Sequence, residues 1–383
     1  RTTEPMDRYT ARSAIVSRDG YVYALDHGDA VEVDQFGAMG DDRSDDRDAI
    51  QAAITYWCRV GGTLRFTPDA RYFVGYFRGP SERIFMIDHV RDAVIDGRNA
   101  TLRAHSSGQR CQTYLFTFRD FRNLTIRSLL ATDSGTDIHV EWRGLYFVSP
   151  DANLGDCDGL YITDVTVTDA VAFLYAAGTL PQRVRNIRLR NCTAIRCYYG
   201  AVFVENGDDA DIELSAVNCR RAYFCYGVAN HKARLTVSHD GSSVGADACC
   251  LIKRYVFDTK AIDIDIRLVG DASTFSNLVK LEHQPTSGGL SSISDISINF
   301  ASIRAIGLDK TVGIGFSSYV GSTLQLRPTE NRTSRISISG RTANIPNLIR
   351  SYSPTRMPIS IALHGDAASR KDIPTSGYDI SRY

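Results

Sequence analysis

The chain has 383 residues, 43% of them hydrophobic, and its 44 Lys and Arg side chains balance 44 Asp and Glu side chains. A formal net charge of zero argues against a general nucleic-acid or membrane-surface binder, and no apolar run approaches the roughly 20 residues that a membrane-spanning helix needs. This length could hold two or three ordinary domains, but a stacked repeat can be equally long as one unit.

The first 30 residues are polar and irregular, and the sequence predicts no role for them. No secretory signal is visible and the chain starts with Arg1, which favours a processed N-terminus. Residues 31–62 are predicted to form a cap with one amphipathic helix. Ser44 is its expected N-cap, and a Gly-Gly pair at 61–62 ends it. The apolar positions of this helix share one face, at i, i+3, i+4 and i+7: Ile50, Ala53, Ile54 and Trp57.

Residues 63–365 are predicted to be stacked copies of a short β-rich unit. Three copies end at a glycine, at 165–178, 187–200 and 214–227. The last two share Asn, Cys, Tyr and Gly at matching positions, so Cys192 and Cys219 are expected to stack as small core residues. Short repeats without a helical pattern bury their apolar side only against their neighbours, which favours a parallel β-helix.

Further rungs of the stack are predicted from runs that alternate apolar and polar residues. They lie at 92–104, 121–134, 293–300, 334–340 and 358–365. Residues 136–154 contain polar clusters and are expected to form a loop over one face. Residues 366–383 are predicted to be a polar tail.

The N-terminal segment resembles a sequence signature of a known protein family. V-D-Q-F-G-A-M-G-D-D-R-S-D-D-R-D-A-I-Q-A-A-I, followed by G-G-T-L-R-F-T-P, resembles the N-terminal signature of the pectate-lyase superfamily. This resemblance implies an all-β, right-handed parallel β-helix with a capping α-helix. The superfamily includes polysaccharide lyases, polygalacturonase-like hydrolases, alginate epimerases and phage tailspike depolymerases, so the resemblance is specific for the fold and not for the reaction.

Aligning the copies by their closing glycines predicts one outward-facing column, because alternate side chains of a strand point in opposite directions. Arg254 and His283 fall one place after this column, at its edge. His231 would face inward with Ala229, and a slip of one residue would turn it into the cleft. The predicted column consists of Tyr199, Glu205, Tyr226, Asn230, Lys232, Asp247, Lys253, Lys280 and Glu282.

The residue types in this column favour a lyase. A hydrolase needs two carboxylates about 5–9.5 Å apart, whereas a lyase needs a cation to neutralise a uronate carboxylate and a base to take the adjacent proton. The Asp-Asp pair of polygalacturonase-like relatives would fall near Tyr198 and Tyr199, which are not acidic. Their Gly-His-Gly motif and the Asp-Pro-His motif of the epimerases are absent.

The sequence therefore predicts a secreted or periplasmic lyase that cleaves an acidic polysaccharide, as a monomer or homotrimer without nucleic-acid or membrane partners. The catalytic candidates are Lys232, Lys253, Tyr226, Arg254 and His231. The substrate-binding candidates are Tyr199, Glu205, Asn230, Asp247, Lys280, Glu282 and His283. No cofactor is expected, because the carboxylates are too scattered for the oxygen cluster that Ca²⁺ needs. The alternatives are a β-helical hydrolase using Glu205, Asp247 or Glu282, and a non-catalytic glycan-binding or tailspike-like protein.

Overall fold

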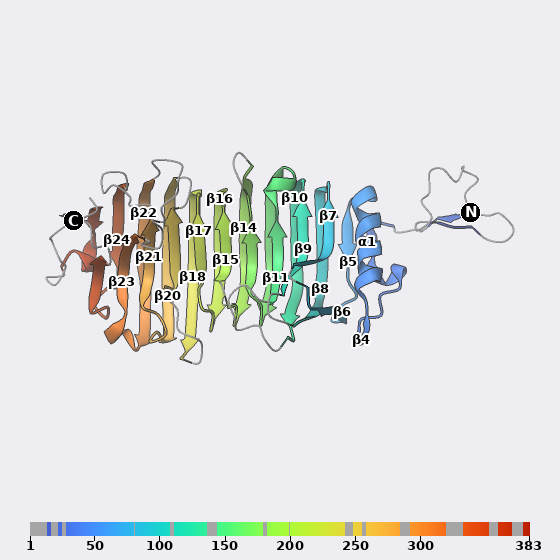
Figure 1. The fold of residues 1–383 in the computed structure, drawn as a ribbon, viewed down its shortest axis with the longest axis horizontal. Helices are drawn as coiled ribbons and strands as arrows, with labels where there is room; N and C mark the ends of the chain where they lie inside the picture. Colours follow the sequence, from blue (N-terminus) through green and yellow to red (C-terminus); the bar gives the residue numbers. More distant parts are fainter. Residues whose placement is uncertain are drawn as a thin grey trace.

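The computed structural model describes residues 14–16, 22–24, 28–79, 81–107, 111–135, 144–178, 182–198, 200–241, 248–254, 258–283, 292–318, 332–351, 359–369 and 378–383. Within these ranges the chain forms an elongated stack with a helix across one end and the C-terminus at the other (Figure 1). From β7 (Glu82–Asp88) to β26 (Ile359–Leu363), successive strands alternate between two parallel sheets, so each of these rungs contributes one strand to each sheet. The predicted right-handed parallel β-helix is confirmed.

The larger sheet contains the long strands. They are β3 (Ala30–Glu32), β5 (Thr63–Arg65), β8 (Arg91–Ser106), β10 (Phe121–Asp133), β12 (Cys157–Thr168), β14 (Val184–Ile195), β16 (Gly207–Val217), β18 (Ala229–Asp240), β20 (Thr259–Asp271), β22 (Ser292–Ile306), β24 (Arg332–Gly340), β26 (Ile359–Leu363) and β27 (Tyr378–Arg382), with β4 (Asp41–Asp45) and β6 (Arg71–Phe77) attached through β8. The predicted rungs coincide with β8, β10, β22, β24 and β26. The sheet also includes β27, which lies within the predicted tail.

The smaller sheet contains the short strands. They are β7 (Glu82–Asp88), β9 (Gln112–Arg119), β11 (Gly144–Pro150), β13 (Ala172–Ala176), β15 (Gly200–Glu205), β17 (Tyr223–Tyr226), β19 (Cys250–Arg254), β21 (Asn277–His283), β23 (Val312–Ser318) and β25 (Asn347–Ser351). The loop expected over 136–154 is wrong for β11, whose seven residues are all buried. The polar residues on both sides of this short apolar run made the whole segment look like a loop in the sequence.

The remaining elements are short, apart from one helix. A separate antiparallel pair, β1 (Ala14–Val16) and β2 (Val22–Ala24), precedes the stack. The 3₁₀ turns are η2 (Val33–Phe36), η3 (Ala152–Leu154), η4 (Leu308–Lys310) and η6 (Gly365–Ala367), and the helix is α1 (Arg47–Val60).

Helix α1 covers the end of the stack as predicted. Its four predicted apolar residues are fully buried, and the Trp57 indole donates to the Gly62 carbonyl oxygen at 3.0 Å. Gly61, with a φ of 75°, ends the helix. Ser44 is not the N-cap, since Asp46 occupies that position and the Ser44 hydroxyl donates to Asp41 at 3.0 Å.

One corner of the larger sheet is built by a ladder of left-handed residues. Nine residues in register on β8 to β24 have φ between 49° and 77°. Most are Asn, Asp or Gly, the residue types that adopt this conformation at least cost. The ladder consists of Asp92, Asn123, Gly159, Asn186, Asp209, Asn230, Ala261, Asp295 and Arg335.

The expected alignment of the repeats is wrong in register. On the larger sheet Leu160 pairs with Ile187, and Ile187 with Ala210, so the rungs differ in length. Cys192 pairs with Leu214. The stacked cysteines are instead Cys197 and Cys219, where the Cys197 amide donates to the Cys219 sulfur at 3.4 Å.

Candidate functional site

A column of polar side chains runs along the outer face of the smaller sheet. Its members are consecutive register partners on four neighbouring strands: Glu205, Tyr226, Lys253 and Glu282. The residue before each of them is buried in the main core, so these four side chains point outward. Rungs lie about 4.8 Å apart. The outward column expected from the sequence is therefore present for these residues.

Two of the predicted residues belong to the other sheet. Lys232 and Asn230 lie on β18, where Lys232 is exposed and is the register partner of Asp211 and Asp263. Asn230 is a corner residue with a φ of 58°. The alignment by glycines misplaced both, because Gly227 already lies in the turn between β17 and β18.

His231 faces inward, as the register predicted. It is 1% exposed, and its Nδ1 lies 2.7 Å from the Tyr223 hydroxyl. Burial lowers the pKa of His231 to about 3, so the ring is neutral at physiological pH. A catalytic role would need this side chain in the cleft, and the slip of register that would place it there does not occur.

The remaining candidates are only partly described. Arg254 and His283 are register partners at the ends of β19 and β21, one place beyond the column. Tyr199 and Asp247 lie outside the described residues.

Glu205 has the most altered acid–base chemistry in the column. The Tyr226 hydroxyl donates a hydrogen bond to its Oε1. Burial raises the pKa of Glu205 from 4.5 to about 7, although hydrogen bonding from Tyr175 acts in the opposite direction. A carboxyl group with this pKa can both take up and release a proton near neutral pH.

The other end of the column is a compact ion cluster. Glu282 is 5% exposed, and each of its oxygens lies 2.8 Å from an ammonium nitrogen, Oε1 from Lys253 and Oε2 from Lys280. Burial would raise the pKa of Glu282, but the two ammonium groups outweigh it and lower the pKa. The cluster carries one net positive charge. Lys253 lies in this positive cluster and is therefore suited to binding an anion.

Aromatic rings cover the same face beside the column. The Phe203 and Phe224 rings stack with their centroids 4.2 Å apart, and Tyr114 stacks on Tyr146 at 4.8 Å. Lys253 Nζ lies 5.5 Å from the centroid of the Phe224 ring. These rings form a second apolar cluster outside the main core, and they exclude water from the groups of the column. These rings were not predicted from the sequence, although aromatic residues at outward positions of short strands are a usable signal.

One carboxylate of this face was also missed. Asp151 forms an isolated bridge with Ala177, which is next to the register pair Ala176 and Val204. Asp151 therefore lies two rungs from Glu205 in the same column, or roughly 10 Å. Its Oδ2 is 3.6 Å from an Arg83 nitrogen.

No group of three or more His, Cys, Asp or Glu is arranged to hold a metal ion in the part of the chain that the structure describes. No helix among the same residues is long and apolar enough to span a membrane.

Comparisons with known proteins concern the fold. No family model matches the chain, and no curated protein matches it in sequence. Among solved structures, a 1,3-α-1,4-β-D-galactose-4-sulfate-3,6-anhydro-D-galactose-2-sulfate 4 galactohydrolase is 13% identical with a TM-score of 0.53, covering 94% of this chain and 97% of that one. An ι-carrageenase complexed to ι-carrageenan fragments is 12% identical with a TM-score of 0.51 and the same coverage. The A-module of an Azotobacter vinelandii mannuronan C-5 epimerase is 16% identical with a TM-score of 0.44, covering 92% and 95%. The first two likenesses support the β-helix.

Proposed function

We propose that this chain is a polysaccharide lyase that cleaves a uronate-containing glycan by β-elimination on the outer face of the smaller sheet. The observation that carries the proposal is the order of three side chains on consecutive rungs. Tyr226 donates a hydrogen bond to Glu205 on one side and neighbours the ion-paired Lys253 on the other. The names of two proteins of similar fold, the carrageenase and the galactohydrolase, describe enzymes that act on polysaccharides. This supports a polysaccharide substrate for this chain.

This order matches the order of the reacting atoms in a uronate. Lys253 binds the C6 carboxylate and so stabilises negative charge that develops at C5. The Tyr226 oxygen takes the C5 proton while its own proton passes to Glu205. The bond between C4 and the glycosidic oxygen breaks, the C4=C5 double bond forms, and Glu205 gives its proton to the departing oxygen. Both side chains then return to their starting protonation states.

Each residue of the column has one role in this proposal. Lys253 neutralises the substrate carboxylate, and Lys280 and Glu282 hold it in position. Lys232 and His231 take no part, because neither lies on the outer face of the smaller sheet. Arg254 and His283 remain proposed as binding residues at the edge of the column.

A second candidate is an inverting glycoside hydrolase, favoured by the pKa of about 7 for Glu205, which suits a general acid. Asp151 would then be the base. Its separation of roughly 10 Å from Glu205 is at the upper limit of the 6.5–9.5 Å of inverting enzymes. Glu282 lies three rungs from Glu205, roughly 14 Å, which is too far for such a pair.

Product analysis separates the two reactions. We would incubate the protein with polygalacturonate, alginate, hyaluronan and other uronate polymers, and follow far-ultraviolet absorbance and new reducing ends in parallel. The lyase is supported when both signals rise together, since only elimination yields an unsaturated uronate. Reducing ends without absorbance would overturn it in favour of the hydrolase. Neither signal on the whole panel would favour the non-catalytic glycan-binding alternative.

A polymeric substrate of this kind also fits the expected secreted or periplasmic location. The proposed monomer or homotrimer is distinguished by a mass measurement in solution.

A further inference from the structure

A second depression lies on the larger sheet, away from the proposed active site. Three consecutive strands, β16, β18 and β20, pair without any shift of register. On one side β14 has an additional residue relative to β16, and on the other β22 has an additional residue relative to β20. The additional residues bring Asn191 and Ala301 to the two rims. The chain therefore forms a dent three strands wide, with a volume of about 240 Å³.

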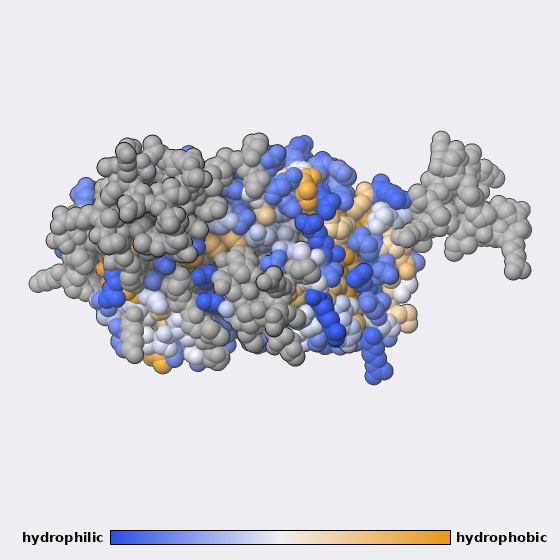
Figure 2. Space-filling view, in the orientation of Figure 1, coloured by the Kyte–Doolittle hydropathy of each residue, from blue (hydrophilic) through white to orange (hydrophobic). Residues whose placement is uncertain are grey.

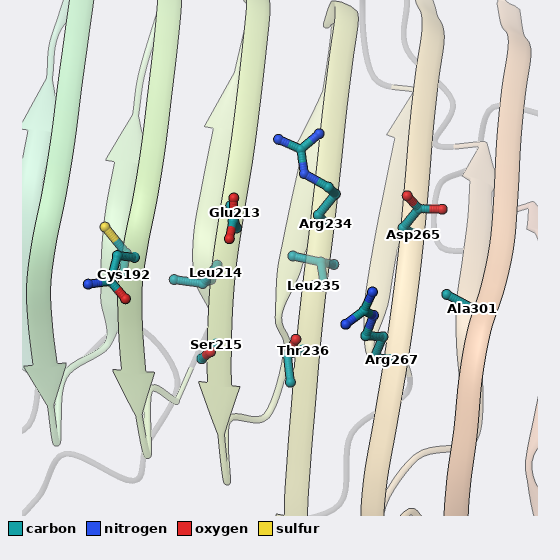
Figure 3. A pocket seen from close by; sticks show the side chains of 11 residues that line it. Cys192, Glu213, Leu214, Ser215, Arg234, Leu235, Thr236, Asp265, Arg267 and Ala301 are labelled. Atoms are coloured by element: carbon teal, nitrogen blue, oxygen red, sulfur yellow. The ribbon is translucent and has the colours of Figure 1, made fainter.

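The floor of this dent is a grid of outward-facing side chains. One row across the three strands consists of Glu213, Arg234 and Asp265. The next row consists of Ser215, Thr236 and Arg267. In Figure 3 these side chains stand between Cys192 on one side and Ala301 on the other. Rows two residues apart along a strand are roughly 7 Å apart, so the grid measures roughly 7 by 10 Å.

Two members of the grid are held in place from outside it. The Arg234 guanidinium donates to Asp211 at 2.9 Å, and Asp265 accepts a hydrogen bond from the Asn299 amide at 2.8 Å. Glu213 and Arg267 have no ion-pair partner among the residues that the structure describes. The dent thus combines two positioned charged groups with two that are available to a ligand.

The charges of the grid are balanced and alternate in sign. Two carboxylates face two guanidinium groups, so the dent offers no net attraction to an anion or a cation. Carboxylates accept hydrogen bonds, guanidinium groups donate them, and the hydroxyls of Ser215 and Thr236 do both. A pair of neighbouring sugar hydroxyls can donate to a carboxylate while accepting from the adjacent guanidinium. The volume is below the roughly 300–1,000 Å³ of pockets for drug-sized ligands, so the ligand is small.

We infer that this dent is a second carbohydrate-binding site that takes one neutral sugar unit of a glycan. It is independent of the proposed reaction, because it lies on the other sheet and shares no residue with the column around Glu205. A site of this kind tethers the polymer without cleaving it.

The inference is tested by saturation-transfer NMR with the methyl glycosides of glucose, galactose, mannose, xylose, galacturonate and glucuronate. We expect at least one neutral glycoside to bind, and its Kd to rise at least tenfold in a Glu213→Ala/Arg267→Ala double variant, which removes two charged hydrogen-bonding groups. Lys232→Ala is the matched control, because it removes an exposed charge from β18 outside the dent. This control should keep the Kd within twofold.

Three results would overturn the inference. These are no binding of any neutral glycoside, binding of the uronate glycosides alone, and binding that survives in the double variant. Circular dichroism of the double variant checks its fold, and the milder Arg267→Gln variant repeats the test if that fold is lost. Because the assay measures binding without turnover, a failure of the lyase proposal would leave its outcome unchanged.

Discussion

Replacing Glu205 with Gln keeps the shape of the side chain but removes its titration. The pKa of Glu205 is raised from 4.5 to about 7 because the carboxylate is buried among aromatic rings. The folded state therefore binds this proton more tightly than the unfolded state does. The stability that this contributes is fully present below pH 4.5 and is lost as the pH rises through about 7.

The size of the effect follows from the two pKa values. One pKa unit corresponds to about 1.4 kcal/mol, so between pH 5 and pH 8 the wild type should lose about 2–3 kcal/mol that the Glu205→Gln variant does not lose. The difference in unfolding free energy between variant and wild type should shift in favour of the variant by this amount.

Urea denaturation at pH 5 and pH 8, monitored by circular dichroism, measures this difference in unfolding free energy. The titrations of all groups that the two proteins share cancel in the difference. Glu213→Gln is the matched control, because Glu213 is an exposed carboxylate on the other sheet. A difference between Glu205→Gln and wild type that is equal at the two pH values would refute the reasoning, since Glu205 would then titrate alike in the folded and unfolded states.

Three further predictions concern stability. Glu282→Gln removes the carboxylate between Lys253 and Lys280 and should cost about 2–4 kcal/mol at pH 7 in urea denaturation; since the pKa of Glu282 is lowered, this cost should shrink as the pH falls below 4.5. Asn230→Val puts a branched residue at a φ of 58° and should cost about 1–2 kcal/mol, whereas Asn230→Gly should leave Tm nearly unchanged. Trp57→Ala empties the centre of the cap and should cost about 3–5 kcal/mol in urea denaturation, and an unchanged transition would mean that the helix does not seal the stack.

Much of the fold follows from local sequence patterns. The helix of the cap was predictable because its buried residues have helical spacing and a Gly-Gly pair follows it. The strands of the larger sheet were predictable because their inward and outward residues alternate. Strand β11 was missed because a strand that is buried on both faces does not alternate between apolar and polar residues. Such an apolar run cannot be assigned to a strand from its periodicity alone.

The register between rungs could not be predicted by aligning identical residues of successive repeats. The glycines that looked equivalent lie at different places, since Gly200 opens β15 whereas Gly227 follows β17. A better marker was available in the Asn, Asp and Gly residues of the corner, which recur once per rung at a left-handed position. Aligning Asn186, Asp209 and Asn230 would have placed Lys232 on the larger sheet.

The column itself was predicted in part. Lys253 and Glu282 face outward as expected, because the spacing assumed between these two rungs equals the register offset between β19 and β21. The raised pKa of Glu205 could not be predicted from the sequence, because it depends on how rings such as Phe203 and Tyr175 pack on the outer face.

The most direct test of the account is the rate of unsaturated-product formation by Tyr226→Phe. This variant keeps the ring and removes only the hydroxyl that links Glu205 to the substrate. Tyr161→Phe is the matched control, because Tyr161 is exposed on β12 of the larger sheet. The account predicts a loss of kcat of at least a hundredfold in Tyr226→Phe, the lower range for a removed acid or base, and an unchanged rate in Tyr161→Phe. A Tyr226→Phe enzyme that forms the unsaturated product at the wild-type rate would contradict it.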